Sequence, residues 1–320
     1  MIIIDEIQKI PELLDPIHRL IENKKIIFLL TGSSARKLKR SGVNLLAGRA
    51  RLQYFFPLTS FEIPDFNLLK YINIGGLPAI YTSKNPYRDL ESYIQLYLKE
   101  EILNEALTRN VRVFHEFLSC IALSSGEEIS YQSMASDLGV SPNTIKNYIE
   151  ILEDTLVAYT LNAFTKTKKR KAITRGKLFF FDVGISNYLA KKKNLEQGST
   201  EFGKSFEQFL ITEIRSYLHY RHLNFSLNYW RSTSSFEVDL IINEKIALEI
   251  KTTTRINDNH LKGLRALKEE NLLTQFLLVS FEEYKRITQD NIIIYPWREF
   301  LKDLWEDKIL PLGQSKYIWE

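Results

Sequence analysis

The sequence has 320 residues, 44% of them hydrophobic and 26% charged, so it can bury more than one core and should divide into two or three domains. Its single cysteine, Cys120, excludes an intramolecular disulfide, and its first residues lack the basic and long apolar regions of a signal peptide. No apolar run approaches the roughly 20 residues that span a bilayer, so we expect a cytoplasmic protein without membrane contact. The net charge of +4 is too small to indicate nucleic acid by itself.

The first 30 residues predict a strand, a helix and a second strand. Residues 1–4 and 25–30 are short apolar runs, and residues 11–22 carry apolar side chains at helical spacing. Such strands belong to parallel sheets covered on both faces, which place their polar chemistry at the carboxyl ends of the strands. Residues 1–60 therefore predict part of an α/β nucleotide-binding core.

The polar residues at these strand ends fit half of an ATP site. Asp5 and Glu6 match the Walker B pattern, in which the aspartate holds the magnesium shell and the glutamate orients the attacking water. Arg49, one element after the second strand, is a candidate arginine finger. The candidate sensors of the γ-phosphate are Thr31, Ser33 and Ser34. A solvated strand end and a surface arginine are the alternative interpretations.

The middle of the chain predicts a helical connector or lid at residues 61–109, followed by a winged helix-turn-helix at residues 110–192. Ala135, Gly139 and Ile145 follow Tyr131 at helix-turn-helix spacing, and Ser141 before Pro142 is a well-formed helix start. The candidate contacts to bases or phosphates on the second helix are Ser141, Asn143, Thr144, Lys146 and Asn147.

A basic hairpin should follow this helix pair, with strands at residues 157–164 and 177–182. Residues 164–181 contain no acid, and the basic side chains include Lys168, Lys169, Arg170 and Lys171. This charge pattern predicts a wing that grips duplex DNA. A winged helix that serves only structure or protein binding is the alternative.

The last domain, residues 194–320, predicts a restriction-endonuclease-like α/β core. A helix at residues 202–220 precedes strands at 228–230, 237–242 and 246–251, then a helix at 259–270 and a strand at 275–280. Alternation along a strand puts Glu249 and Lys251 on one face, beside Asp239 of the neighbouring strand. Two carboxylates can bind Mg²⁺ while lysine orients a water, and Glu207 on the preceding helix can complete the metal shell.

The chain also resembles a known family over essentially its whole length. The similar blocks are residues 2–8, 30–35, 47–50, 56–62, 75–78, 181–184 and 237–239. They are similar to the archaeal and bacterial AAA-type ATPases that carry a C-terminal domain of unknown function. The resemblance implies binding of ATP and Mg²⁺, and hydrolysis coupled to a DNA-linked task.

One departure from the family concerns the phosphate-binding loop. A Gly-x-x-x-x-Gly-Lys-Ser/Thr motif should precede Walker B, and only Met1 precedes the first strand. We therefore expect a fragment, a split gene product or a decayed paralogue that does not hydrolyse ATP alone. It would pair with a fragment bearing the phosphate-binding loop, or with copies of itself.

The sequence thus predicts a DNA-associated AAA-family protein with an incomplete nucleotide site. One alternative is a Mg²⁺-dependent endonuclease that uses Asp239, Glu249 and Lys251. Another is a non-enzymatic module that binds DNA or protein.

Overall fold

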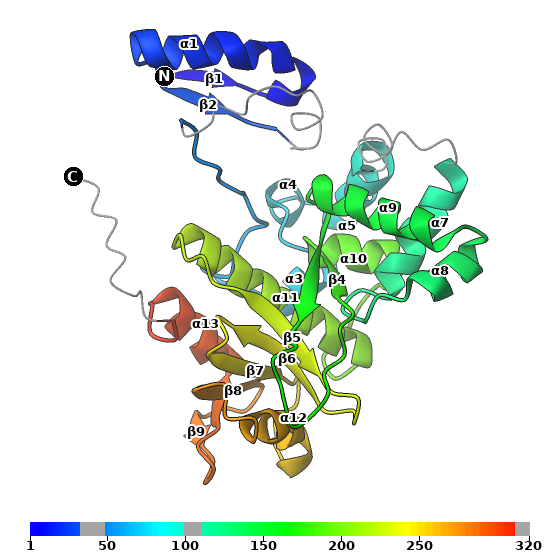
Figure 1. Ribbon diagram of the computed structural model, residues 1–320, viewed down its shortest axis with the longest axis vertical. Coiled ribbons are helices and arrows are strands. Elements are labelled where there is room, and N and C mark those ends of the chain that lie inside the picture. The colour runs from blue at the N-terminus through cyan, green and yellow to red at the C-terminus, as the bar shows by residue number, and fades with distance from the viewer. Residues whose placement is uncertain (33–48, 99–110, 311–320) are drawn as a thin grey trace.

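The computed structural model describes residues 1–32, 49–98 and 111–310 (Figure 1). Its N-terminal unit contains strand β1 (Ile2–Ile4), two 3-10 turns, η1 (Ile7–Lys9) and η2 (Pro11–Leu13), helix α1 (Leu14–Lys24) and strand β2 (Phe28–Leu30). The two strands pair in parallel, as predicted, because α1 provides the crossover between them. Ile7, Leu14 and Ile17 form a small core of their own. The side chains of Ile3, Ile27 and Leu29 remain exposed.

Short helices follow, where the sequence suggested a connector or lid: α3 (Leu68–Ile74), α4 (Pro78–Tyr81), α5 (Pro86–Ser92) and the π-helical turn η3 (Tyr93–Leu98). Ile72 and Ile94 are fully buried in the core that the later helices share. The described part of this segment is therefore packed into the protein. The end of the predicted connector, residues 99–109, lies outside the described residues.

The next unit consists of α7 (Val111–Leu123), α8 (Tyr131–Leu138), α9 (Pro142–Asp154), the antiparallel hairpin β3 (Ala158–Ala163) and β4 (Lys177–Phe180), and α10 (Val183–Leu189). The α8–α9 turn has the chemistry that the sequence indicated. Gly139 ends α8 at φ 62°, a left-handed conformation that glycine adopts without strain, and the Ser141 side chain accepts a hydrogen bond from the Thr144 amide.

The hairpin tip, residues 164–176, does not project as a free wing. The Phe164 and Ile173 amides donate to the Tyr229 and Arg231 carbonyls of the C-terminal unit. The Glu270 carboxylate accepts the backbone amides of Lys168, Lys169 and Arg170 at 2.8–2.9 Å. The tip is therefore docked on the C-terminal unit, and its contact with DNA stays a prediction.

The C-terminal unit contains α11 (Thr200–Tyr220), β5 (Leu227–Arg231), β6 (Glu237–Ile242), β7 (Ile246–Ile250), α12 (Asp258–Lys268), β8 (Gln275–Ser280), β9 (Arg286–Ile287), β10 (Ile293–Pro296) and α13 (Trp297–Trp305). The predicted strands and helices are present with ends shifted by one to two residues, and β9, β10 and α13 are additional. Because β3 pairs with β5, the sheet of the described chain has the order β4-β3-β5-β6-β7-β8-β10-β9.

Side chains that alternate along the strands build two layers around this sheet. Leu240 and Ile242 of β6 pack in the core that includes α11 and α13, and Ile241 between them packs in the core under α12. The core that includes α11 and α13 also contains side chains of α3, α7 and α10. The unit from α7 to α10, which we call the middle unit, therefore shares one apolar interior with the C-terminal unit (Figure 1). None of the helices described here is long and apolar enough to cross a membrane.

Candidate metal centre

The Asp…Glu-x-Lys residues meet where β7 ends. Leu240 of β6 lies opposite Leu248 of β7, so Asp239 and Glu249 are neighbours one position further along the same pair of strands. The Lys251 ammonium lies 2.5 Å from Glu249 Oε1 and 3.8 Å from Asp239 Oδ2. The Ile250 amide donates to Asp239 Oδ2 at 2.7 Å. The structure thus brings together the three side chains that the sequence selected, and their catalytic role stays a prediction.

Glu207 reaches these residues from α11. Its Oε1 atom lies 3.8 Å from the Lys177 ammonium and, within the described chain, accepts no hydrogen bond. Burial, with the negative charge of Asp239 next, raises the pKa of Glu207 to about 8. We call Glu207, Asp239, Glu249 and Lys251 together the acidic centre.

The electrostatics of the acidic centre indicate a shortage of positive charge. Burial, followed by the charge of Asp239, raises the pKa of Glu249 well above its usual range. Burial opposes the charge of Lys251, but Asp239 and Glu249 outweigh it and raise the pKa of this ammonium. Carboxylates that are crowded in this way favour a further cation, and sites with such perturbed pKa values are often functional.

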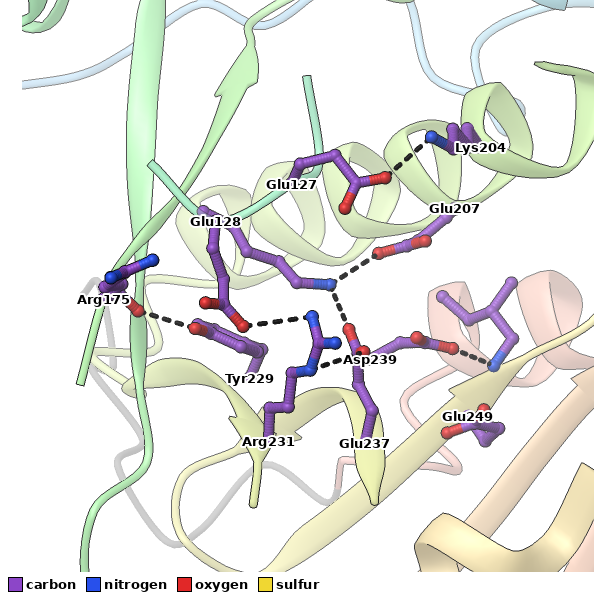
Figure 2. A network of polar contacts seen from close by, with 12 residues as sticks. Glu127, Glu128, Arg175, Lys204, Glu207, Tyr229, Arg231, Glu237, Asp239 and Glu249 are labelled. Atoms are coloured by element: carbon purple, nitrogen blue, oxygen red, sulfur yellow. Dashed lines mark hydrogen bonds and ion pairs between the residues drawn. The ribbon is translucent and has the colours of Figure 1, made fainter. Parts of the chain in front are cut away.

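Further charged residues surround the acidic centre, and sequence reasoning had not placed them there (Figure 2). Lys177, which the sequence assigned to the basic hairpin, is buried with its ammonium 2.5 Å from Glu237 Oε1. Arg231 links Glu128, at 3.1 Å, with Glu237, at 3.7 Å. One sequence signal for the position of Lys177 was available: it directly precedes the apolar run Leu178–Phe180, and a charge beside buried strand residues needs a partner.

If Mg²⁺ bound at the acidic centre, Asp239 and Glu249 would hold it and waters would complete its shell. Within residues 1–32, 49–98 and 111–310, no three histidine, cysteine or acidic side chains are arranged to hold a metal ion by themselves. Mg²⁺ is commonly bound by one or two carboxylates, with waters and phosphate oxygens completing the shell. Glu249 Oε2 is buried without a hydrogen-bond partner among the described atoms, which leaves one ligand atom available.

The second predicted site lies at the ends of β1 and β2. The Thr31 hydroxyl donates to Asp5 Oδ1, and the Glu6 amide donates to Thr31 Oγ1 at 3.3 Å. Gln8 Nε2 donates to Glu6 Oε2 at 2.7 Å. Asp5, Glu6 and Thr31 therefore lie together, whereas the candidate sensors Ser33 and Ser34 lie outside the described residues.

Arg49, the candidate arginine finger, forms an ion pair with Glu22 of α1. If Mg²⁺ bound at the ends of β1 and β2, the Asp5 carboxylate would be its ligand. In residues 1–320, no Gly-x-x-x-x-Gly-Lys-Ser/Thr motif precedes Asp5.

Comparison with known proteins agrees with this N-terminal geometry. A known AAA domain matches residues 1–63. Residues 1–63 are similar to this AAA domain, and we refer to them by that name. Two domains of unknown function follow it, DUF8612 at residues 65–196 and DUF4143 at residues 202–300.

Relatives match the AAA domain and the two following domains together. An uncharacterized protein of Mycobacterium tuberculosis is 24% identical over 98% of this chain and 72% of its own length. An uncharacterized protein of Methanocaldococcus jannaschii is 23% identical over 94% of the chain and 70% of its own length. A protein of Haemophilus influenzae is 21% identical over 81% of the chain and 69% of its own length. No solved structure matches the chain.

The predicted DNA contacts divide into exposed and docked residues. On α9, Ser141, Asn143, Lys146 and Asn147 are exposed and Thr144 is half-buried. Ser141 caps the helix, and Lys146 forms a 4.0 Å pair with Glu150.

The charged side chains of the hairpin tip also divide. Arg170 pairs with Glu269 at 2.6 Å, and the Lys169 ammonium donates to the Glu269 carbonyl. Lys168 and Lys171 are exposed. Two of the four predicted wing residues therefore have their charge directed at the C-terminal unit.

Proposed function

We propose that this chain is a DNA-associated protein whose C-terminal unit is a Mg²⁺-dependent, restriction-endonuclease-like centre for cleavage of phosphodiester bonds. The observation that carries the proposal is the meeting of Asp239, Glu249 and Lys251 at the end of β7. Its support includes the buried, unpaired Glu249 Oε2 atom and the raised pKa of Glu249, which both suit a site that receives a cation.

Each residue of the acidic centre has a distinct role in this proposal. Asp239 and Glu249 hold the cation, and water and a DNA phosphate oxygen complete its shell. The bound Mg²⁺ supplies stabilisation of phosphate charge and a more acidic water. Lys251, whose side chain is 34% exposed, can reach solvent and orient the attacking water from beside both carboxylates.

We further propose that α7–α9 and the β3–β4 hairpin act as a winged helix that binds duplex DNA. The exposed polar face of α9 supports this, together with Lys168 and Lys171, which are exposed on the docked hairpin tip. Both surfaces belong to the unit whose hairpin joins the sheet of the acidic centre, so DNA bound there would lie on a unit that is paired with the proposed cleavage site through β3 and β5.

Plasmid nicking tests the nuclease proposal directly. The full chain should nick supercoiled DNA with Mn²⁺ or Mg²⁺ and not with EDTA, and Lys251→Ala should abolish nicking while the protein still binds Mn²⁺. Glu244→Gln is the matched control, because Glu244 lies in the β6–β7 turn and pairs with Lys166 away from the acidic centre. Metal binding without nicking, at every metal tried, would support a non-enzymatic DNA-binding module instead.

A second candidate function, nucleotide binding by the AAA domain, is favoured by the hydrogen-bonded group Asp5, Glu6 and Thr31. We propose that another polypeptide, either a fragment with a phosphate-binding loop or a second copy, completes this site. The exposed apolar side chains of Ile3, Ile27 and Leu29 on the β1–β2 sheet support such a contact. Its binding would cover them.

Titration with a fluorescent ATP analogue and Mg²⁺ tests this second candidate. The 320-residue chain alone should show no binding at micromolar analogue. Tight binding by the chain alone that disappears in Asp5→Ala would show that the phosphates are held by residues of this chain, which would contradict the need for a partner.

A further inference from the structure

Lys177 is the residue by which the middle unit enters the acidic centre. It is the first residue of β4, where it pairs with Leu161 of β3 and forms a bridge with Glu128. Only 5% of its side chain is exposed, and its ammonium lies 5.0 Å from the centroid of the Tyr229 ring. Strand pairing on both sides fixes the backbone of Lys177, and burial restricts its side chain.

The acids that form ion pairs with Lys177 come from the C-terminal unit, and Glu127 of the middle unit also acts on it electrostatically. Its ammonium is 2.5 Å from Glu237 Oε1 and 3.8 Å from Glu207 Oε1. Asp239 follows on the same face of β6 as Glu237 and contributes to the electrostatics of both Lys177 and Glu207. Asp239 is thus shared between two positions, one on the Glu249 and Lys251 side and one on the Glu207 and Glu237 side.

An aspartate shared in this way is the arrangement from which two-metal phosphodiesterase sites are built, with ions about 3.5–4 Å apart. In this protein the second position, on the Glu207 and Glu237 side, already contains the positive charge of Lys177. Lysine carries a compact point charge and no acceptor atom, so it neutralises carboxylates as an ion does but cannot coexist with an ion in the same space. Glu207 Oε1, which has no hydrogen bond in the described structure, is the oxygen that faces Lys177.

We propose that Lys177 is a built-in cation at the second metal position of the acidic centre, so that the centre binds one divalent ion and not two. The assignment of the first ion to Asp239 and Glu249 rests on the proposed function. The second position is new, and its occupant is supplied by the middle unit. Because Lys177 is almost fully buried, it acts as a positioning residue that sets the charge and the ion count of the centre.

The experiment counts Mn²⁺ ions by calorimetric titration of the full chain. Every protein carries Asp5→Asn, so that the AAA domain does not contribute. The parent protein should bind one Mn²⁺, and Lys177→Met should bind two. Lys177→Met with Glu207→Gln should return to one, because the second position has then lost a ligand. Lys204→Met is the matched control and should bind one Mn²⁺. Lys204 also links the middle and C-terminal units, because it pairs with Glu127 at 2.7 Å, but its side chain is 43% exposed.

A second variant covers the case in which Lys177→Met does not fold. Lys177→Met with Glu237→Gln removes one carboxylate together with the lysine, so the buried charge stays balanced, and Glu207 and Asp239 remain to hold the second ion. This variant should also bind two Mn²⁺. One ion in both folded variants, or two ions in the parent protein, overturns the proposal.

The counts also separate this proposal from the nuclease proposal. One ion in the parent and one in Lys177→Met overturns the role of Lys177 and leaves the Asp239–Glu249 site standing. No ion in the parent and one in Lys177→Met supports the role of Lys177 and contradicts the first metal site. No ion in either protein overturns both.

Discussion

The AAA domain and the C-terminal unit each place acidic residues at the end of a strand, in very different surroundings. Asp5 and Glu6 follow β1 of a two-stranded sheet, where Ile3 is 62% exposed. Asp239 and Glu249 lie in the middle of a larger sheet and are 7% and 6% exposed. The same side-chain chemistry is solvated in one region and buried in the other, and burial is what makes the second set of acids compete for cations.

The comparison also shows what each region still needs. The acids of the C-terminal unit have positively charged partners within the described chain. One of these partners is Lys177, which lies 60 residues before Glu237 in the sequence. The unit around the β1–β2 sheet has a core of only three buried apolar residues in the described structure, with partly buried side chains packed against it, and it leaves others, such as Ile3, Ile27 and Leu29, exposed. The four predictions below test this contrast.

The largest expected effect is on apolar packing. Ile241 is fully buried under α12, so Ile241→Ala should lower the free energy of unfolding by about 2–5 kcal/mol. Ile3→Ala should change it by less than about 0.5 kcal/mol, because that side chain is mostly exposed. Urea unfolding of both variants measures the difference. An equally large loss for Ile3→Ala would mean that self-association covers the β1–β2 sheet.

A buried acid should make stability depend on pH. Glu213 of α11 accepts hydrogen bonds from the Ser60 amide, the Ser60 hydroxyl and the Trp305 indole, yet burial raises its pKa from 4.5 to about 7. A pKa raised by folding gives stability that is complete below pH 4.5 and is lost as pH rises through about 7. At about 1.4 kcal/mol per pKa unit, this loss is about 3 kcal/mol.

Urea unfolding at pH 5, 6, 7 and 8 checks this pH dependence. Glu213→Gln should unfold more easily at pH 5, because it loses acceptor atoms, but its stability should fall less between pH 5 and 7. Glu12→Gln, at an exposed position of the AAA domain, is the control and should keep the wild-type slope. A parallel pH profile for Glu213→Gln would assign the wild-type slope to other buried acids, such as Glu207.

Metal binding should stabilise one region and not the other. An ion that binds only the folded state adds about 2.7 kcal/mol at 100 times its Kd. Millimolar Mn²⁺ should therefore raise the Tm of the full chain, Asp239→Asn should abolish the rise, and Asp5→Asn should leave it intact. A rise that depends on Asp5 and not on Asp239 would place the metal site in the AAA domain.

The smallest effect is expected from the ion pair that links Arg49 to Glu22. Both side chains are about two-fifths exposed, so Glu22→Gln should cost between about 0 and 1 kcal/mol and less at high salt. Thermal melts at two salt concentrations measure this cost. A loss well above this range would show that Arg49 fixes the position of α1, which an exposed pair does not ordinarily do.

The sequence alone predicted features that depend on near neighbours along the chain. The turn at Gly139 and the cap at Ser141 follow from local backbone chemistry. Asp239, Glu249 and Lys251 could be placed together because β6 and β7 form a tight hairpin, and alternation along two adjacent strands determines which side chains share a face. The β1–α1–β2 order of the AAA domain could be predicted for the same reason, since its apolar runs are short and continuous.

Only the tertiary structure decided where the basic hairpin goes and what it does. Its charge pattern predicted a DNA-binding wing but not its contacts within the protein: Glu270 binds its backbone from about 100 residues away, and Lys177 pairs with Glu237 and Glu207. No local pattern identifies the partners in such pairings: the apolar run after Lys177 indicates that this charge needs a partner, but not which acid supplies it. Long-range packing settles the choice, since a charge removed from water must find its partner wherever the fold brings one.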